Sequence, residues 1–153
     1  MMTIKNVLAG SVVLCAGLAF GGAEASAEEA SAEETNAARP CASGVKTIKP
    51  VVLEDPGRWT YTYNLSWCAD GGTVAWIEPS VIARVHTPAC RWVGRIEESL
   101  QKPPQGSSQW TATDTSEFSC ADNAGKEHGV NPWVIVNFVP AGAYKITSGI
   151  DPA

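Results

Sequence analysis

The sequence has little of what enzymes and nucleic-acid-binding proteins need. Only two of its 153 residues are histidines, and it contains no G-x-S-x-G, H-E-x-x-H or phosphate-binding glycine loop. Its net charge of −5 leaves no basic surplus, so no nucleic-acid partner is expected. No cysteine pair has C-x-x-C spacing, so neither a metal site nor another cofactor is expected. From these absences we predict a protein that is not an enzyme.

The two histidines leave one enzymatic alternative open. His86 falls at the end of a predicted strand, and His128 falls in a polar loop. A histidine pair with a nearby lysine or glutamate can cleave a phosphodiester by acid–base catalysis, as in small secreted nucleases. The spacing of the two residues does not itself support this chemistry, so a packing or surface role is the favoured interpretation of each.

The chain also lacks an apolar run long enough to span a bilayer. The uncharged run from Val7 to Phe20 is shorter than the roughly 20 residues that a spanning helix needs. It follows Lys5 and precedes Ala25-Ser26-Ala27, whose small residues suit a cleavage site. This order predicts a secretory signal peptide over residues 1–27. We therefore expect a secreted, extracellular protein with no membrane contact after the signal is removed.

A short repeat of small and acidic residues, ASAEE followed by ASAEE, follows the apolar run. Such a segment buries too little apolar surface to offset its ordering entropy. We predict a disordered acidic tether over residues 28–40 and one secreted domain over residues 41–153. The domain carries nine Lys and Arg against eleven Asp and Glu, so most of the acidity belongs to the tether. We expect the domain to be monomeric.

Four cysteines remain once the leader, with Cys15, is removed. An even number in an exported chain predicts two disulfides. The hairpin register described below favours Cys90–Cys120 together with Cys41–Cys68, and the other two connectivities stay open.

The domain sequence is β throughout. No stretch beyond Cys41 keeps apolar residues at helical spacing, whereas apolar and polar residues alternate without a break from Trp59 to Trp67. We predict an all-β fold, a small antiparallel β-sandwich of immunoglobulin-like architecture with about seven or eight strands. A small closed barrel is the alternative.

Three turn signals predict hairpins in which apolar side chains face each other. The turns are Asp70-Gly71, Pro103–Gly106 and Val139–Gly142. The predicted pairs are, in that order, Trp67–Val74 and Leu65–Trp76; Leu100–Trp110, Trp92–Phe118 and Cys90–Cys120; and Phe138–Tyr144 and Val136–Ile146. A bulge would shift any of these registers.

Six tryptophans are many for a domain of this size. Some must form the core, but an exposed aromatic ring can stack on a sugar or anchor a protein interface. We favour a core role for the stripe of alternating aromatic residues from Trp59 to Trp67. Trp110, next to a hairpin tip, is the best single candidate for an exposed ring. The candidate ligand-binding residues are Trp110, Trp59, Tyr61, Tyr63 and Trp67.

These features predict a small secreted, non-catalytic binding module. It would use exposed aromatic residues to bind an extracellular polymer or protein, such as a glycan, the cell wall or a protein ligand. The alternative is a secreted proteinaceous inhibitor of a protease or amylase, acting through a loop near residues 103–110.

Overall fold

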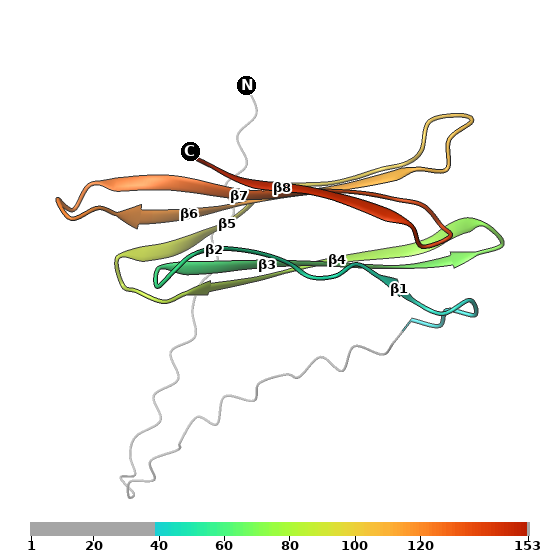
Figure 1. The fold of residues 1–153 in the computed structure, drawn as a ribbon, viewed down its shortest axis with the longest axis horizontal. Coiled ribbons are helices and arrows are strands. Elements are labelled where there is room, and N and C mark those ends of the chain that lie inside the picture. Colours follow the sequence, from blue (N-terminus) through green and yellow to red (C-terminus); the bar gives the residue numbers. More distant parts are fainter. Residues whose placement is uncertain (1–38, 153) are drawn as a thin grey trace, which may run out of the picture. The chain divides into compact units, whose positions relative to one another are not determined.

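A computed structural model describes residues 39–152, which form an all-β domain without helices. Two sheets face each other (Figure 1). In the first sheet, β3 pairs with β4 along one edge and with β1 and β2 along the other; in the second, β5, β6, β7 and β8 lie in sequence order. The strands are β1 Lys46–Thr47, β2 Val51–Asp55, β3 Trp59–Asp70, β4 Thr73–Val85, β5 Cys90–Gln101, β6 Trp110–Ala121, β7 Glu127–Phe138 and β8 Tyr144–Pro152.

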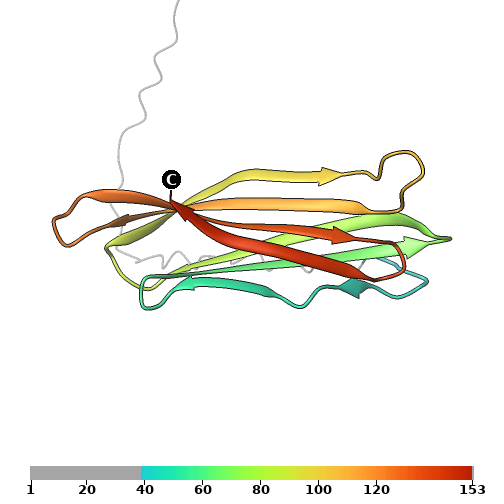
Figure 2. The ribbon, with the colours of Figure 1, turned by 45° about the horizontal axis from the view of Figure 1, so that its top comes forward.

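The predicted antiparallel sandwich is confirmed, with eight strands among the described residues. The chain runs up and down, and apart from the short β1 each strand pairs with its neighbour in sequence inside its sheet (Figure 2). Short connections favour such neighbours. The sheets therefore share the layered architecture of an immunoglobulin domain, but the described strands follow a meander and not a Greek key.

Because the strands alternate in direction, the connections gather at two ends, on the right and left in Figure 1. We refer to the right-hand end, with residues 71–72, 102–109 and 139–143, as the loop end. The left-hand end, with residues 56–58, 86–89 and 122–126, is the network end.

The core lies between the sheets and takes its largest side chains from β3. Every second residue from Trp59 to Trp67 points at the second sheet and is at most 1% exposed. The facing strands offer small or medium side chains, such as Ala112 on β6 and Val134 on β7, and the rings of Phe118 and Phe138. Burying each large apolar side chain stabilises the fold by roughly 1.5–3 kcal/mol. The alternation seen in the sequence is therefore the pattern of the core.

The predicted register of the first hairpin is wrong. The turn is Gly71-Gly72, both with positive φ, and not Asp70-Gly71. Trp67 accordingly lies opposite Ile77 instead of Val74, and Leu65 lies opposite Pro79 instead of Trp76. A register shift between Cys68 and Ala69 adds to the difference. Gly-Gly and Asp-Gly both favour the same two-residue hairpin turn, so the turn residues did not distinguish Asp70-Gly71 from Gly71-Gly72.

The register of the last hairpin is confirmed. Phe138 lies opposite Tyr144 and Val136 opposite Ile146. The N–H of Gly142 donates to the carbonyl of Val139 at 3.0 Å, and Gly142 has the positive φ that a type I turn with a bulge requires.

The register of the hairpin from β5 to β6 is right at its base and wrong at its tip. Trp92 lies opposite Phe118 as predicted, but Leu100 lies opposite Ala112 and not opposite Trp110. Two irregularities cause the difference, one between Trp92 and Gly94 and one between Arg95 and Glu97. Each adds a residue to β5, and a bulge leaves no reliable trace in an alternating pattern.

Both predicted disulfides are confirmed, and neither joins the two sheets. Cys41 bonds to Cys68 on β3, with Cα atoms 5.7 Å apart, and Cys90 bonds to Cys120 across β5 and β6. The first lies near the loop end and the second near the network end. The predicted leader, 1–27, and the tether up to residue 38 lie outside the described residues. Within residues 39–152 the structure has no helix long and apolar enough to cross a membrane.

Candidate functional site

Four of the five aromatic candidates are core residues and are removed from the ligand-binding set. Trp59 stacks on Phe118 with ring centroids 4.6 Å apart, and Trp67 lies 4.7 Å from Phe138. Rings enclosed in this way cannot stack on a ligand unless the sheets separate, so the stripe has the core role that was favoured for it. The four residues are Trp59, Tyr61, Tyr63 and Trp67, each 0–1% exposed.

The fifth candidate, Trp110, is partly buried and not exposed as predicted. It begins β6 directly after the loop 102–109 and packs against the core, with its ring centroid 6.4 Å from that of Phe138. The exposed aromatic rings are instead Trp92 and Tyr144, at 44% and 42%. Both lie on outer strands of the second sheet, where one side has no neighbouring strand. The sequence predicts which face a residue takes but not whether its strand lies at an edge.

A hollow of about 440 Å³ lies at the loop end, and its walls are mostly apolar. It is open to solvent and bordered by four segments that are far apart in the sequence: the start of the domain, the β3–β4 turn, the β5–β6 loop and the β7–β8 turn. The lining residues are Ser43, Lys46, Ala69, Gly71, Gly72, Ser108, Val139, Pro140 and Ala141. A smaller hollow of about 230 Å³ continues past Ser108 to Trp110. The predicted loop 103–110 therefore lines a concave surface.

The walls of this hollow are held in place by covalent and polar contacts. The Cys41–Cys68 disulfide ties the first segment to β3, and the Ser43 hydroxyl donates to the carbonyl of Ala69. The side chain of Lys46 passes within 3.5 Å of the position that a Cβ on Gly142 would occupy. The disulfide thus fixes one wall against the strand that forms the next.

The β5–β6 loop has internal hydrogen bonds of its own. The N–H of Ser107 donates to the carbonyl of Pro104 at 3.0 Å, and the N–H of Gln109 donates to the Ser107 hydroxyl at 3.1 Å. The Gln109 amide also reaches Asn137 on β7, at 3.3 Å. With two adjacent prolines at its start, the loop is pre-ordered, which lowers the entropy cost of binding.

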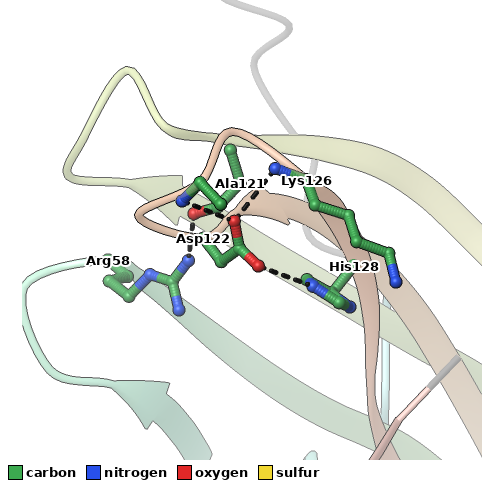
Figure 3. A network of polar contacts seen from close by, with 6 residues as sticks. Arg58, Ala121, Asp122, Lys126 and His128 are labelled. Carbon is green, nitrogen blue, oxygen red and sulfur yellow. Dashed lines mark hydrogen bonds and ion pairs between the residues drawn. The ribbon is translucent and has the colours of Figure 1, made fainter.

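The network end is polar, and its central carboxylate, Asp122, already holds partners within the domain. Asp122 accepts the backbone N–H of Lys126 and of Ala124, at 2.9 and 2.8 Å, and contacts the His128 ring at 3.2 Å (Figure 3). These contacts, led by the Lys126 N–H, hold the pKa of Asp122 below its ordinary value. Arg58 donates to the carbonyl of Ala121 at 2.9 Å. Asp122 therefore organises the β6–β7 turn.

Two further charged residues near this end, Arg58 and Glu127, are paired too. Arg58 pairs with Asp55 at 3.3 Å. Glu127 accepts the Ser119 hydroxyl at 2.8 Å and Arg91 at 3.0 Å, and these contacts lower the pKa of Glu127. A hollow of about 410 Å³ lies between Arg58 and Asn123, but the charged groups on its walls already hold partners.

The two histidines do not form one site. The Nε2 atom of His86 contacts the Thr60 hydroxyl at 2.8 Å on the first sheet, whereas His128 on the second contacts Asp122. No hydrogen bond among the described residues joins the two rings. In residues 39–152 no three His, Cys, Asp or Glu side chains gather as a metal site.

The sequence interpretation missed a buried carboxylate between the sheets. Asp114 on β6 is 0% exposed, accepts the Tyr61 hydroxyl at 2.7 Å, and pairs with Arg95 on β5, which also pairs with Glu98 at 2.8 Å. Burial, followed by the hydrogen bond to Asp114, raises the pKa of Tyr61 far above its ordinary value. The sequence did contain a signal for this burial, because alternation along β6 places Asp114 on the same face as Phe118.

Comparisons with known proteins leave the chain without an assigned family. No family model and no curated protein matches it. Among solved structures, it is similar to a hypothetical protein from Listeria monocytogenes, with 14% identity over 71% of this chain and 67% of that chain. The TM-score of that similarity is 0.36, which is too low to assign a shared fold or function.

Proposed function

We propose that this chain is a small exported, non-catalytic protein that binds a protein partner outside the cell through its loop end. One observation carries the proposal: the pre-ordered loop 102–109 and three other segments border an open, mostly apolar hollow. Hairpin loops commonly have two to five residues, and longer ones are often functional.

The contrast in charge favours the loop end over the network end. At the network end Arg58, Asp122 and Glu127 all hold partners within the domain, so a ligand would have to compete with those contacts. At the loop end the hollow has mostly apolar walls, with Lys46 its one charged lining residue. Apolar concave surfaces gain free energy when a complementary side chain displaces water from them.

The position of the aromatic rings favours a protein over a glycan as the ligand. A glycan platform needs several flat rings side by side and open to solvent, but the stripe on β3 is buried and Trp110 is partly covered. The two exposed rings, Trp92 and Tyr144, lie on opposite edge strands of the second sheet, β5 and β8. A protein partner needs a pocket for an anchoring side chain and a rim, which the loop end offers.

Two disulfides support the export that the proposal assumes. Disulfides persist mainly in oxidising compartments outside the cytosol. The Cys41–Cys68 and Cys90–Cys120 bonds fit the secretory leader predicted at residues 1–27.

Inhibition of a hydrolase is the second candidate, and the order within the β5–β6 loop favours it. A loop that enters an enzyme cleft binds tightly when it is rigid beforehand. Pro103 and Pro104 restrict the backbone, and the Ser107 contacts close the loop on itself. In this case the partner would be a protease or an amylase.

The test compares two arginine substitutions, one at each end. Ser108→Arg places a large cation in the loop-end hollow, and Asn123→Arg makes the same kind of change beside the network-end hollow. Both residues are exposed, so both variants should fold. We expect immobilised wild type and Asn123→Arg to retain the same extracellular proteins and Ser108→Arg to lose them. Equal retention by all three proteins contradicts the proposal.

The inhibitor form has its own assay. The protein is added in micromolar excess to a panel of extracellular proteases and amylases. Inhibition that Ser108→Arg abolishes and Asn123→Arg preserves would identify the hydrolase class, whereas full activity throughout the panel removes this candidate. Retention on insoluble glycans that survives Ser108→Arg would instead favour a polymer ligand.

A further inference from the structure

The outer edge of β8 is the most regular strand edge of the domain. β8 pairs with β7 over all nine residues, from Tyr144 to Pro152, without a register shift. The other long edges are interrupted, since β5 has two register shifts and β4 contains Pro79. Bulges and prolines are common devices that prevent edge strands from pairing with other chains. β8 has no bulge, and its one proline, Pro152, is its last residue. Among the described residues nothing pairs with its outer side.

The hydrogen bonds of the adjoining turn show which backbone groups of β8 are free. The N–H of Val139 donates to the carbonyl of Ala143 at 3.0 Å, so these residues form a hydrogen-bonded pair. Hydrogen-bonded pairs alternate with non-bonded ones along an antiparallel ladder. The odd-numbered residues of β8 therefore bond to β7, and Ile146, Ser148 and Ile150 direct their N–H and carbonyl groups away from it.

We propose that this edge pairs with the β8 edge of a second copy of the chain, antiparallel about a two-fold axis through Ser148. Ser148 then bonds to Ser148 of the second copy, and Ile146 bonds to Ile150 of the second copy. The two second sheets become one continuous sheet across the dimer.

The charges of β8 select both this partner and this register. With the axis at Ser148, Lys145 lies opposite Asp151 of the second copy, and both side chains are on the outer face of the sheet. Opposite charges on directly facing residues stabilise a strand pair, and like charges destabilise it. The two-fold symmetry forms this ion pair twice. The strand is therefore complementary to itself in charge.

Neighbouring registers lose this match. Moving the axis to Thr147 sets Lys145 opposite Gly149, and moving it to Gly149 sets Asp151 opposite Thr147. Both shifts also leave strand ends unpaired. The register through Ser148 is the one that pairs all nine residues and both charges.

The edge is accessible and already ordered. Ile150 is 44% exposed, and Lys145 and Asp151 are exposed as well. The Tyr144 hydroxyl accepts the N–H of Lys49 at 3.1 Å, which ties the start of β8 to the first sheet. The proposal replaces the monomer expected from the sequence and does not depend on the proposed function. Because the β8 strands run antiparallel, the two loop ends would point in opposite directions.

A charge swap tests the proposal, with the dimer dissociation constant measured by sedimentation equilibrium over a concentration series. Lys145→Glu places like charges opposite each other twice and should raise the dissociation constant by about tenfold. The double variant Lys145→Glu/Asp151→Lys restores the ion pairs with their signs exchanged and should restore the wild-type value. Lys102→Glu makes the same charge change at an exposed site away from β8 and should have no effect.

A backbone variant keeps the test independent of charge. Ser148→Pro removes an N–H that faces away from β7, so it should leave the β7–β8 ladder and the circular dichroism spectrum intact. We expect this variant to be monomeric. A wild type that is monomeric at all concentrations overturns the proposal. So does a dimer that Ser148→Pro leaves intact, or one in which the double variant fails to recover affinity.

Discussion

The two ends of the sandwich are built from the same elements, hairpin connections held by one disulfide, but they use charge in opposite ways. At the network end Arg58, Asp122 and Glu127 are paired inside the domain. At the loop end a longer loop and glycine- and proline-containing turns surround an apolar hollow. An end whose polar groups bond to one another is stable but has few free polar groups with which to bind a ligand. We therefore expect a partner to bind at the end without such pairs.

Removal of each disulfide should have the largest effect and should separate the two ends. Cys41→Ser/Cys68→Ser and Cys90→Ser/Cys120→Ser open loops of similar length, spanning 27 and 30 residues. Each should lower the free energy of unfolding by about 3–4 kcal/mol, measured by denaturant titration. At a temperature where both variants remain folded, only the first should lose partner retention. Equal loss in both would mean that the hollow does not depend on its own disulfide.

Asp114→Ala should affect both ends together, because this carboxylate lies in the core between them. The change leaves the Tyr61 hydroxyl and the Arg95 guanidinium without their buried partner. We expect a loss of about 3 kcal/mol in the free energy of unfolding. Hydrogen exchange of backbone amides should accelerate at both ends. Acceleration at one end alone would show that the two ends do not share one cooperative core.

Trp110→Ala should weaken the loop end more than Trp92→Ala weakens the rest of the domain. Trp110 packs on the core beside Phe138, whereas Trp92 is 44% exposed on the edge strand β5. We expect Trp110→Ala to cost about 2 kcal/mol and Trp92→Ala less than about 1 kcal/mol. Thermal melts of the two variants measure the difference, and equal melting temperatures would contradict the anchoring role of Trp110.

Lowering the pH should destabilise the network end and leave the loop end unchanged. This is the smallest of the predicted effects. The folded pKa of Asp122 lies below its ordinary value of 3.8. Its stabilisation is therefore complete above pH 3.8 and is lost as the pH falls through the folded pKa. The amide signals of Ala124 and Lys126, which donate to Asp122, should shift in this range by NMR.

The control for the acid experiment is an amide at the other end. The N–H of Gln109 donates to the Ser107 hydroxyl, which does not titrate. Its signal should stay constant from neutral pH to pH 3. If the Gln109 and Lys126 signals move together, the change is global and the assignment to Asp122 is wrong.

Features set by short-range chemistry could be predicted from the sequence. The alternation from Trp59 to Trp67 identified the core stripe, and the Val139–Gly142 turn gave the right register. In these two cases one residue pattern determines one local geometry. The match of Cys90 with Cys120 came from counting along a hairpin, and it holds because the displaced tip register and the two extra residues of β5 offset each other.

Features set by the whole fold could not be predicted. The two extra residues of β5 interrupt its pairing with β6, and an alternating pattern does not record them. The exposure of Trp92 and Tyr144 depends on which strands lie at the edges of the sheet. The hollow forms where four distant segments meet, so no single segment predicts it.

Site-specific photo-crosslinking tests the central claim most directly. A photoreactive amino acid replaces Gln105 at the tip of the β5–β6 loop in one protein and Asn123 at the network end in another; both positions are exposed. After irradiation with an extracellular protein fraction, we expect a discrete crosslinked protein from position 105 that Ser108→Arg abolishes, and none from position 123. Crosslinks from position 123 alone, or a crosslink at position 105 that Ser108→Arg leaves intact, would contradict the account.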